Sequence, residues 1–287
     1  MADYSIWMVE TARKQDDGIV IFSGFMRSAE MVDTGLSLVV LQGEGHTILI
    51  DTGVDANDPE NAERLKDRGY YNVISPAAAL KKLKITPEEI TDIIITHAHW
   101  DHVGAAWCYP NARFYIQREE LNAWREMQSL PPAYAALTRS IISSHIDYLF
   151  QLAETGRLRL LDGPCDELLP GIRIYTSPDG HTPMGQYVHI DCGAGYVATG
   201  DVTFSSDNII NDAGFLIPPG RLIATGSTQA LLQTLETVCR LCEGEPARLL
   251  IPHDAAVYGR VPAVQTEDRL RTAEFRLQKT GMSRLSL

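Results

Sequence analysis

Four side chains that bind metal ions well lie within six residues of one another, in the run His97-Ala98-His99-Trp100-Asp101-His102. A catalytic zinc ion usually keeps three protein ligands and one open position. Four donors in one loop exceed that need, so the spacing predicts two adjacent metal ions that share further ligands. Because alternate side chains of an extended segment point the same way, we expect His97, His99 and Asp101 to face one side. His102 would then arrive from an adjacent direction, at a turn into a helix.

Three further donors stand apart in the sequence, each after an apolar run typical of a β-strand. They are His181 in the sequence GHTP, Asp201 in TGD and His253 in IPHD. Enzymes of the α/β class commonly place their site residues at the carboxyl ends of strands. We therefore expect these three donors to complete the site that the histidine-rich loop begins.

The elements that must position these donors are strands followed by helices, and this order occurs twice. Short β-branched and apolar runs predict strands over residues 36–41, 46–51, 92–96, 172–176, 187–191, 196–199 and 249–251. Prolines after cap residues predict short helices from Pro76 and Pro87, and apolar periodicity predicts helices over residues 227–242 and from Thr266. The order predicts an α/β fold of the αββα type, a sandwich of two mixed β-sheets flanked by helices.

No linker interrupts this pattern, so we expect one domain over residues 1–287. Residues of about 107–170 are aromatic and helical in pattern, which predicts a helical insertion between the two groups of donors. Such an insertion would line the active-site cleft, and Trp107 and His145 are its candidates for the substrate pocket.

The composition is that of a globular protein, with 45% hydrophobic and 22% charged residues. A formal net charge of -12 disfavours nucleic acid, and no apolar stretch approaches the roughly 18 residues that a membrane helix needs. Five cysteines, an odd number at irregular positions, indicate reduced thiols. We therefore expect a cytoplasmic protein that acts on a small molecule, with no nucleic-acid or membrane partner, and leave open whether it forms a homodimer.

Over residues 36–254 the ordered donors resemble the signature of the metallo-β-lactamase superfamily, a His-x-His-x-Asp-His loop followed by a His, an Asp and a final His. The resemblance implies two divalent metal ions, zinc first, with manganese or iron as alternatives. It implies one metal ion bound by His97, His99 and His181, a second bound by Asp101, His102 and His253, and a bridge made by Asp201. Asp51, in the run LIDTG, matches an aspartate that orients a ligand imidazole without binding metal.

Within this superfamily the chain is most similar to the N-acyl homoserine lactone lactonases and pyridoxolactonase-like enzymes. Two positions depart from the lactonase pattern and are further candidates for the substrate pocket: Met184 replaces a common glycine, and Phe204 replaces a catalytic tyrosine. The resemblance implies a hydrolase in which metal-activated hydroxide opens a carbonyl substrate, with Asp201 and Asp101 as catalytic carboxylates. A lactone is the expected substrate. A cyclic amide, an amide or a thioester is the alternative, and an iron-dependent oxidoreductase of the same fold is the alternative from another class.

Overall fold

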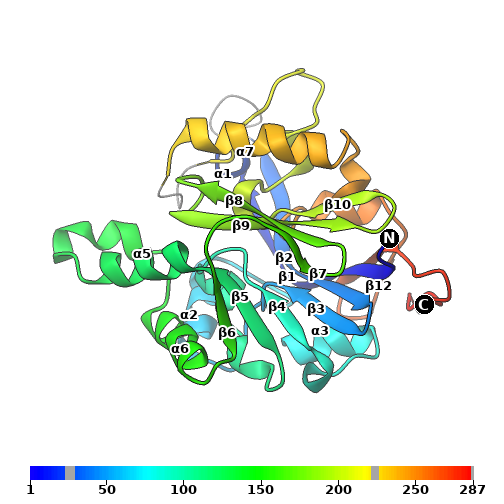
Figure 1. The fold of residues 1–287 in the computed structure, drawn as a ribbon. Coiled ribbons are helices and arrows are strands. Elements are labelled where there is room, and N and C mark those ends of the chain that lie inside the picture. Colours follow the sequence, from blue (N-terminus) through cyan, green and yellow to red (C-terminus); the bar gives the residue numbers. More distant parts are fainter. Residues whose placement is uncertain (23–29, 221–225, 286–287) are drawn as a thin grey trace.

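Two β-sheets pack face to face in the computed structural model, and helices cover the outer face of each sheet (Figure 1). The structure describes residues 1–22, 30–220 and 226–285. This arrangement confirms the predicted sandwich of two mixed sheets flanked by helices. Among the described residues, no helix is both long and apolar enough to cross a membrane.

The larger sheet has eight strands and is antiparallel from β12 to β3 and parallel from β3 to β6. In spatial order its strands are β12 (Ala263–Gln265), β13 (Arg271–Arg276), β1 (Tyr4–Asp17), β2 (Met31–Gly43), β3 (His46–Ile50), β4 (Asp92–Ile94), β5 (Arg113–Gln117) and β6 (Leu158–Leu161). The long strands β1 and β2 pair along their whole length, so they form a hairpin that reaches beyond the other strands.

The smaller sheet has five strands, of which only β10 and β11 pair in parallel. In spatial order they are β11 (Leu249–Leu250), β10 (Gly195–Ala198), β9 (Met184–Asp191), β8 (Ile172–Pro178) and β7 (Cys165–Leu169). Since β8, β10 and β11 run in the same direction, their carboxyl ends lie at one edge of this sheet.

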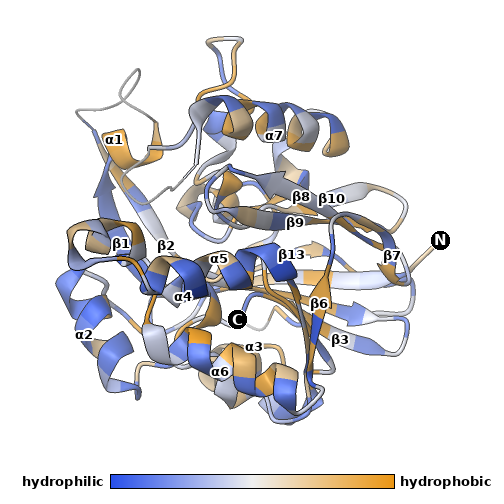
Figure 2. Ribbon diagram, turned by 60° about the vertical axis from the view of Figure 1, so that its left-hand side comes forward, coloured by the Kyte–Doolittle hydropathy of each residue, from blue (hydrophilic) through white to orange (hydrophobic). Residues whose placement is uncertain are grey.

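The α-helices are mostly short and lie outside the two sheets. They are α1 (Gly18–Ile21), α2 (Pro59–Asp67), α3 (Pro76–Lys82), α4 (Trp100–Val103), α5 (Arg118–Gln128), α6 (Ser143–Glu154) and α7 (Thr228–Leu241). Short 3-10 turns lie between the helices and strands: η1 (Pro87–Glu89), η2 (Ala106–Cys108), η3 (Pro132–Thr138), η4 (Gly200–Val202), η5 (Ser206–Asn208), η6 (Pro246–Arg248) and η7 (Ala255–Gly259). In Figure 2, α7 carries hydrophobic and hydrophilic residues along its length, as expected of a helix with one buried face.

Alternation along the strands divides the apolar side chains among the layers. In β1, Ile6 and Met8 join the core between the two sheets, whereas Trp7 and Val9 join the core between the larger sheet and its helices. Both faces of the first half of the strand are therefore buried, which explains the apolar run over residues 6–9, whereas the second half is largely polar and partly exposed. A third apolar cluster lies between α7 and the smaller sheet.

The two chain ends differ from the sequence-based expectations. The helix expected from Thr266 is wrong, because Arg271–Arg276 forms strand β13 and pairs antiparallel with β1. No strand was expected over Tyr4–Asp17, which forms β1 in the middle of the larger sheet. These two segments lie at opposite ends of the sequence and pair with each other in the sheet. A local sequence pattern cannot show such a pairing.

Residues 107–170 are helical only in part. They contain α5 and α6, but Arg113–Gln117 and Leu158–Leu161 are the strands β5 and β6, and β7 also begins before residue 170. β5 pairs in parallel with β4 and β6 with β5, so these strands continue the larger sheet. The segment expected to be a helical insertion therefore contains strands of both sheets besides its helices, because the flanking helical periodicity in the sequence outweighed a five-residue run of strand-forming residues.

Candidate metal centre

The predicted donors lie in loops at the carboxyl ends of strands from both sheets. β3 and β4 run in parallel and end shortly before Asp51 and the loop that begins at His97. β8, β10 and β11 end shortly before His181, Asp201 and His253. The two sheets thus bring donors from distant parts of the chain to one place.

The structure collects the seven donors into two groups. One buried group consists of His97, His99, His181 and Asp201, and the second consists of Asp101, His102 and His253. The donor atoms within each group lie within 4.8 Å of one another. The Nε2 atoms of His97 and His99 are buried without a hydrogen-bond partner among the described residues. A buried polar atom without a partner is costly, so this set of nitrogen and oxygen donors fits divalent metal ions.

The carboxylate of Asp201 lies between the two groups. Its Oδ2 atom is 3.3 Å from Nε2 of His181 and 3.7 Å from Nε2 of His97. Its Oδ1 atom is 3.0 Å from Nε2 of His253 and 3.1 Å from Nε2 of His102. Each carboxylate oxygen therefore faces a different group of imidazoles.

Asp101 lies with His102 and His253, so the expectation that it shares a side with His97 and His99 is wrong. The chain is extended at His99 but enters α4 at Trp100. Asp101 is therefore helical, and a helix turns by about 100° per residue where a strand would turn by 180°. Its Oδ2 atom lies 3.8 Å from Nε2 of His253.

Asp51 orients two of the imidazoles, that of His102 directly and that of His97 through Thr96. Its carboxylate accepts hydrogen bonds from the backbone N–H of Thr96 at 2.7 Å and from the Thr96 hydroxyl at 2.8 Å, and lies 2.7 Å from Nδ1 of His102. The Thr96 hydroxyl in turn lies 3.0 Å from Nδ1 of His97. A proton on each Nδ1 atom satisfies these contacts and leaves the Nε2 lone pair free to bind metal.

Two backbone positions make this arrangement possible. Asp51 has a φ of 65°, a left-handed conformation that aspartate tolerates better than most residues. Gly200 has a φ of 53°, and a Cβ atom there would lie 2.6 Å from the Thr96 hydroxyl oxygen. Only glycine leaves room for the hydroxyl that connects His97 to Asp51.

The charges in the centre depend on one another. Burial, and after it the imidazoles of His102 and His99, hold the pKa of His97 well below its usual range. Burial opposes ionisation of Asp201, but His102 and His253 hold its pKa well below the usual range. His97 is therefore neutral and Asp201 is ionised at neutral pH, which are the forms that bind metal.

Glu120 of α5 is a residue that the sequence reasoning missed. Its buried carboxylate accepts hydrogen bonds from the backbone N–H of Ala98 at 3.1 Å and of Met184 at 2.9 Å, and from Nε1 of Trp124 at 2.7 Å. Burial raises the pKa of Glu120. It ties the histidine loop to the segment that follows His181. Its position in an amphipathic helix carries no sequence signal for this role.

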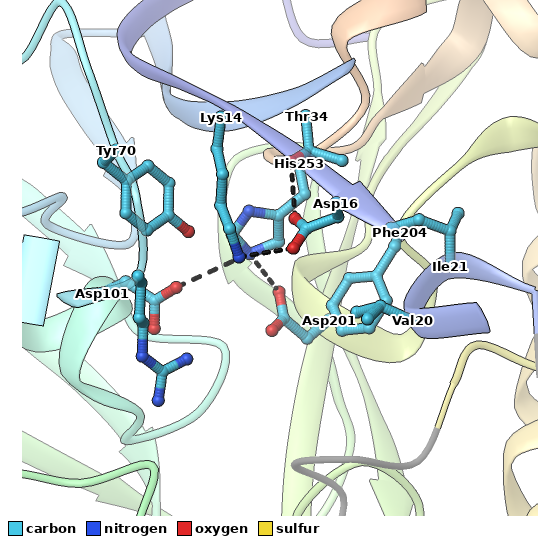
Figure 3. Close-up of a pocket in the computed structure, with 11 residues that line it drawn as sticks. Lys14, Asp16, Val20, Ile21, Thr34, Tyr70, Asp101, Asp201, Phe204 and His253 are labelled. Atoms are coloured by element: carbon cyan, nitrogen blue, oxygen red, sulfur yellow. Dashed lines mark hydrogen bonds and ion pairs between the residues drawn. The ribbon is translucent and has the colours of Figure 1, made fainter. Parts of the chain in front are cut away.

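A pocket of about 160 Å³ opens onto the second group of donors. Figure 3 shows Tyr70 on one side and Val20, Ile21 and Phe204 on the other, with Lys14, His253 and Asp201 between them. The lining residues are Lys14, Asp16, Val20, Ile21, Thr34, Arg68, Tyr70, Asp101, Asp201, Phe204 and His253. Most of these side chains come from the β1–β2 hairpin and from the end of α2, which sequence reasoning did not connect with the site.

Of the four pocket candidates, the structure brings only Phe204 to this pocket. Its ring packs edge-on against His181 and His253, at centroid distances of 5.8 and 5.6 Å. Met184 lines a different pocket beside α5, because its backbone N–H is held by Glu120. Trp107 and His145 pack against each other with their ring centroids 5.3 Å apart, and neither lines the pocket at the metal donors.

Comparison with known proteins matches residues 32–253 to the family model of the metallo-beta-lactamase superfamily. The chain belongs to this superfamily. It is a metallo-hydrolase of the metallo-beta-lactamase fold, and both groups of donors lie within the matched residues or at their last position.

Curated relatives and solved structures of this superfamily agree on the fold. An N-acyl homoserine lactonase from Bacillus sp is 24% identical over 202 residues, which cover 65% of this chain and 71% of the relative. The crystal structure of AiiA from B. thuringiensis, mutant F107W with N-decanoyl-L-homoserine bound, matches at a TM-score of 0.66 and 18% identity, over 91% of this chain and 98% of that one. AidC, a dizinc quorum-quenching lactonase, matches at a TM-score of 0.63 and 16% identity, over 98% and 96% of the two chains.

Proposed function

We propose that the chain binds two divalent metal ions and uses them to open a lactone ring. The first ion would be held by His97, His99 and His181, the second by Asp101, His102 and His253, with Asp201 between them. The observation that carries this proposal is the placement of Asp201, whose two carboxylate oxygens face different groups of imidazoles. Zinc is the first choice of metal, because imidazole and carboxylate donors suit it; manganese and iron are the alternatives.

When bound, a pair of divalent metal ions lowers the pKa of a water molecule toward neutrality and polarises a carbonyl group. The residues of the chain would hold the metal ions, orient the ligand imidazoles and transfer the proton. Asp51 orients His102 directly and His97 through Thr96. Asp201 accepts the proton of the attacking water at a carboxylate oxygen and passes it to the leaving oxygen of the ring. Asp101 lines the pocket beside it and is the second catalytic carboxylate.

The lactone proposal is supported by the lactonases among the relatives, and Phe204 restricts which lactone is suitable. A phenyl ring has no hydroxyl to donate to a substrate oxygen, and a missing donor of this kind typically costs about 10²–10³ in rate. We therefore expect slow hydrolysis of simple homoserine lactones and faster hydrolysis of ring-bearing or more apolar carbonyl substrates that pack against Phe204. Values of kcat/KM for both series measure this, and homoserine lactones turned over at about 10⁵ M⁻¹s⁻¹ or faster would refute it.

The test of the proposed function combines elemental analysis with a substrate panel. The purified and reconstituted protein should hold two metal ions per chain and hydrolyse members of a panel of lactones, cyclic amides, amides and thioesters. One metal ion or fewer after reconstitution would contradict the paired centre. Turnover of an amide or thioester without any lactone would move the function to the alternative substrates, and a tightly held iron centre without hydrolysis would favour the oxidoreductase.

We also propose a single domain over residues 1–287 and a cytoplasmic location. Both sheets contribute donors to one centre, which supports folding as one unit. All five cysteines are free, as expected in a reducing compartment. A single cooperative unfolding transition and recovery of activity in the cytoplasmic fraction of the source cells test these two points.

A further inference from the structure

We propose that the substrate carries a carboxylate in addition to its reacting carbonyl group, and that Arg68 and Lys14, which both line the pocket, bind this carboxylate. The inference rests on the proposed hydrolase function and adds the chemical class of its substrate. It is carried by the side chains of the pocket that do not belong to either group of metal donors.

Arg68 is a pocket cation without a carboxylate partner. It follows the last turn of α2, and its guanidinium group lies 5.5 Å from the centre of the Trp100 ring. Among the described residues, no carboxylate lies within 4.0 Å of it, whereas Arg260 lies 2.8 Å from Asp254. Arg64 on the same helix, by contrast, donates hydrogen bonds from its guanidinium group to the backbone carbonyl oxygens of Arg139 and Ile141. The planar face of Arg68 is thus supported by an indole ring, while its N–H groups remain available to an incoming carboxylate.

Lys14 adds a second cation to the lining of the same pocket. It lies on β1, and its ammonium group pairs with Asp16 and lies 5.5 Å from the centre of the Tyr70 ring. Asp16 is also held by the Thr34 hydroxyl at 2.7 Å, so the position of this pair is well defined. Figure 3 shows the ammonium group of Lys14 beside Asp16 in the pocket that Asp101, Asp201 and His253 also line. Lys14 is therefore a partly neutralised cation and Arg68 is the stronger anchor.

The balance of charge favours an anion once the metal ions are bound. The two pocket carboxylates that belong to the donor groups are Asp101 and Asp201, and two divalent ions outweigh them by two positive charges. Of the two cationic side chains that line the pocket, Asp16 neutralises Lys14 and leaves Arg68 uncompensated. The loaded pocket is therefore positive, although the whole chain has a formal net charge of -12. A positive pocket in an acidic protein selects an anionic ligand at short range.

The apolar side of the pocket defines the rest of the ligand. Val20, Ile21 and Phe204 line it, and Phe204 belongs to a buried apolar cluster with Ile21. In Figure 3 these side chains stand across the pocket from Tyr70, with Asp201 and His253 between them. A substrate that presents its carbonyl group to the metal donors can therefore place an apolar part on Phe204 and a carboxylate toward Arg68.

The test compares substrates that have the same shape and differ in charge. The first pair is 5-oxotetrahydrofuran-2-carboxylate and its carboxamide, and the panel extends to ester, thioester and cyclic amide pairs matched in the same way. The metal-loaded wild-type enzyme should hydrolyse the carboxylate of at least one pair with a kcat/KM at least 10-fold above that of its carboxamide. A charged hydrogen-bonded contact is typically worth about this factor to a factor of 100.

Variants of Arg68 and Lys14 then test whether these two side chains cause the preference for the carboxylate. Arg68→Gln should lower the carboxylate-to-carboxamide ratio of kcat/KM by about 10- to 100-fold, mainly through KM, and Lys14→Gln should lower it less, because Asp16 already pairs with Lys14. The matched control is Lys66→Gln, which removes a cation from the exposed side of the same helix and should leave the ratio unchanged. Metal content and unfolding temperature are measured for every variant.

The outcomes separate this inference from the proposed function. Hydrolysis without a preference for the carboxylate, or an unchanged ratio in Arg68→Gln, would overturn the inference and leave the hydrolase intact. If the metal-loaded enzyme hydrolyses no member of the panel, the proposed function fails, and calorimetric titration with the first pair decides the anion site alone. Tighter binding of the carboxylate that is lost in Arg68→Gln and kept in Lys66→Gln would support the site. Equal binding of the two compounds would overturn it.

Discussion

Replacement of Asp51 by asparagine removes one acceptor without changing the shape of the side chain. The carboxylate now serves three donors: the backbone and hydroxyl of Thr96, and Nδ1 of His102. In Asp51→Asn, one carboxylate oxygen becomes an N–H₂ group that cannot accept from either the hydroxyl or Nδ1. Asparagine also tolerates the φ of 65° at this position, so the change tests hydrogen bonding and not backbone strain.

The expected effect is a loss of metal affinity of about 10- to 100-fold, the usual result of removing a partner that orients a ligand. This corresponds to about 1.4–2.8 kcal/mol. The loss should be larger at the site that contains His102, since His102 contacts Asp51 directly and His97 only through Thr96. Competition with a chromophoric chelator measures both affinities, and chemical denaturation of the metal-free protein measures the change in the free energy of unfolding.

Asp92 offers a matched control. Its buried carboxylate also lies 2.7 Å from Nδ1 of a histidine, His46, and accepts from the Tyr115 hydroxyl at 2.8 Å, but it lies at the start of β4, away from the donors. Asp92→Asn should lower the free energy of unfolding and leave metal affinity unchanged. Metal affinities of Asp51→Asn within about threefold of wild type, or an equal loss in both variants, would refute the argument that Asp51 orients the ligands.

Four further substitutions test other parts of the structure. Asp101→Ala and His102→Ala should each reduce the metal content from two ions per chain toward one, as measured by elemental analysis; two retained ions in both would contradict the proposed assignment. Gly200→Ala should destabilise the protein by about 1–3 kcal/mol, because the new methyl group meets Thr96 at a left-handed position, and denaturant titration checks this. Burial lowers the pKa of His145 to about 4 from an ordinary 6.5, so wild-type stability present above pH 6.5 is lost as the pH falls toward 4, by about 3 kcal/mol from this group. His145→Leu should flatten that part of the stability profile, and an unchanged slope would show that His145 is not responsible.

The amino-acid sequence was sufficient to predict the class of the fold, which the structure confirms, and the seven donors, which the structure places in two neighbouring groups. The apolar runs that form strands and the donors that follow them can both be recognised in short stretches of sequence. Residue types and spacing were therefore sufficient to predict a sandwich of two sheets. Asp51 belongs to the same kind of signal, because it stands directly after a strand in the run LIDTG. Met184 and Phe204 could be recognised as departures from a pattern, but only the structure shows that one lines the pocket and the other does not.

The spacing of the motif alone does not give the division of the donors into two groups; the superfamily resemblance implied it, and the fold shows how it arises. Asp101 joins His102 because the chain turns into α4 at Trp100, and the spacing of the motif alone does not show where extended backbone ends. Lys14 and Arg68 line one pocket because the fold brings β1 and the end of α2 to the same place. Pairings between distant segments, such as β1 with β13, arise from the packing of the whole chain. Their free energy comes from burial on both faces of a sheet, which no local window of residues contains.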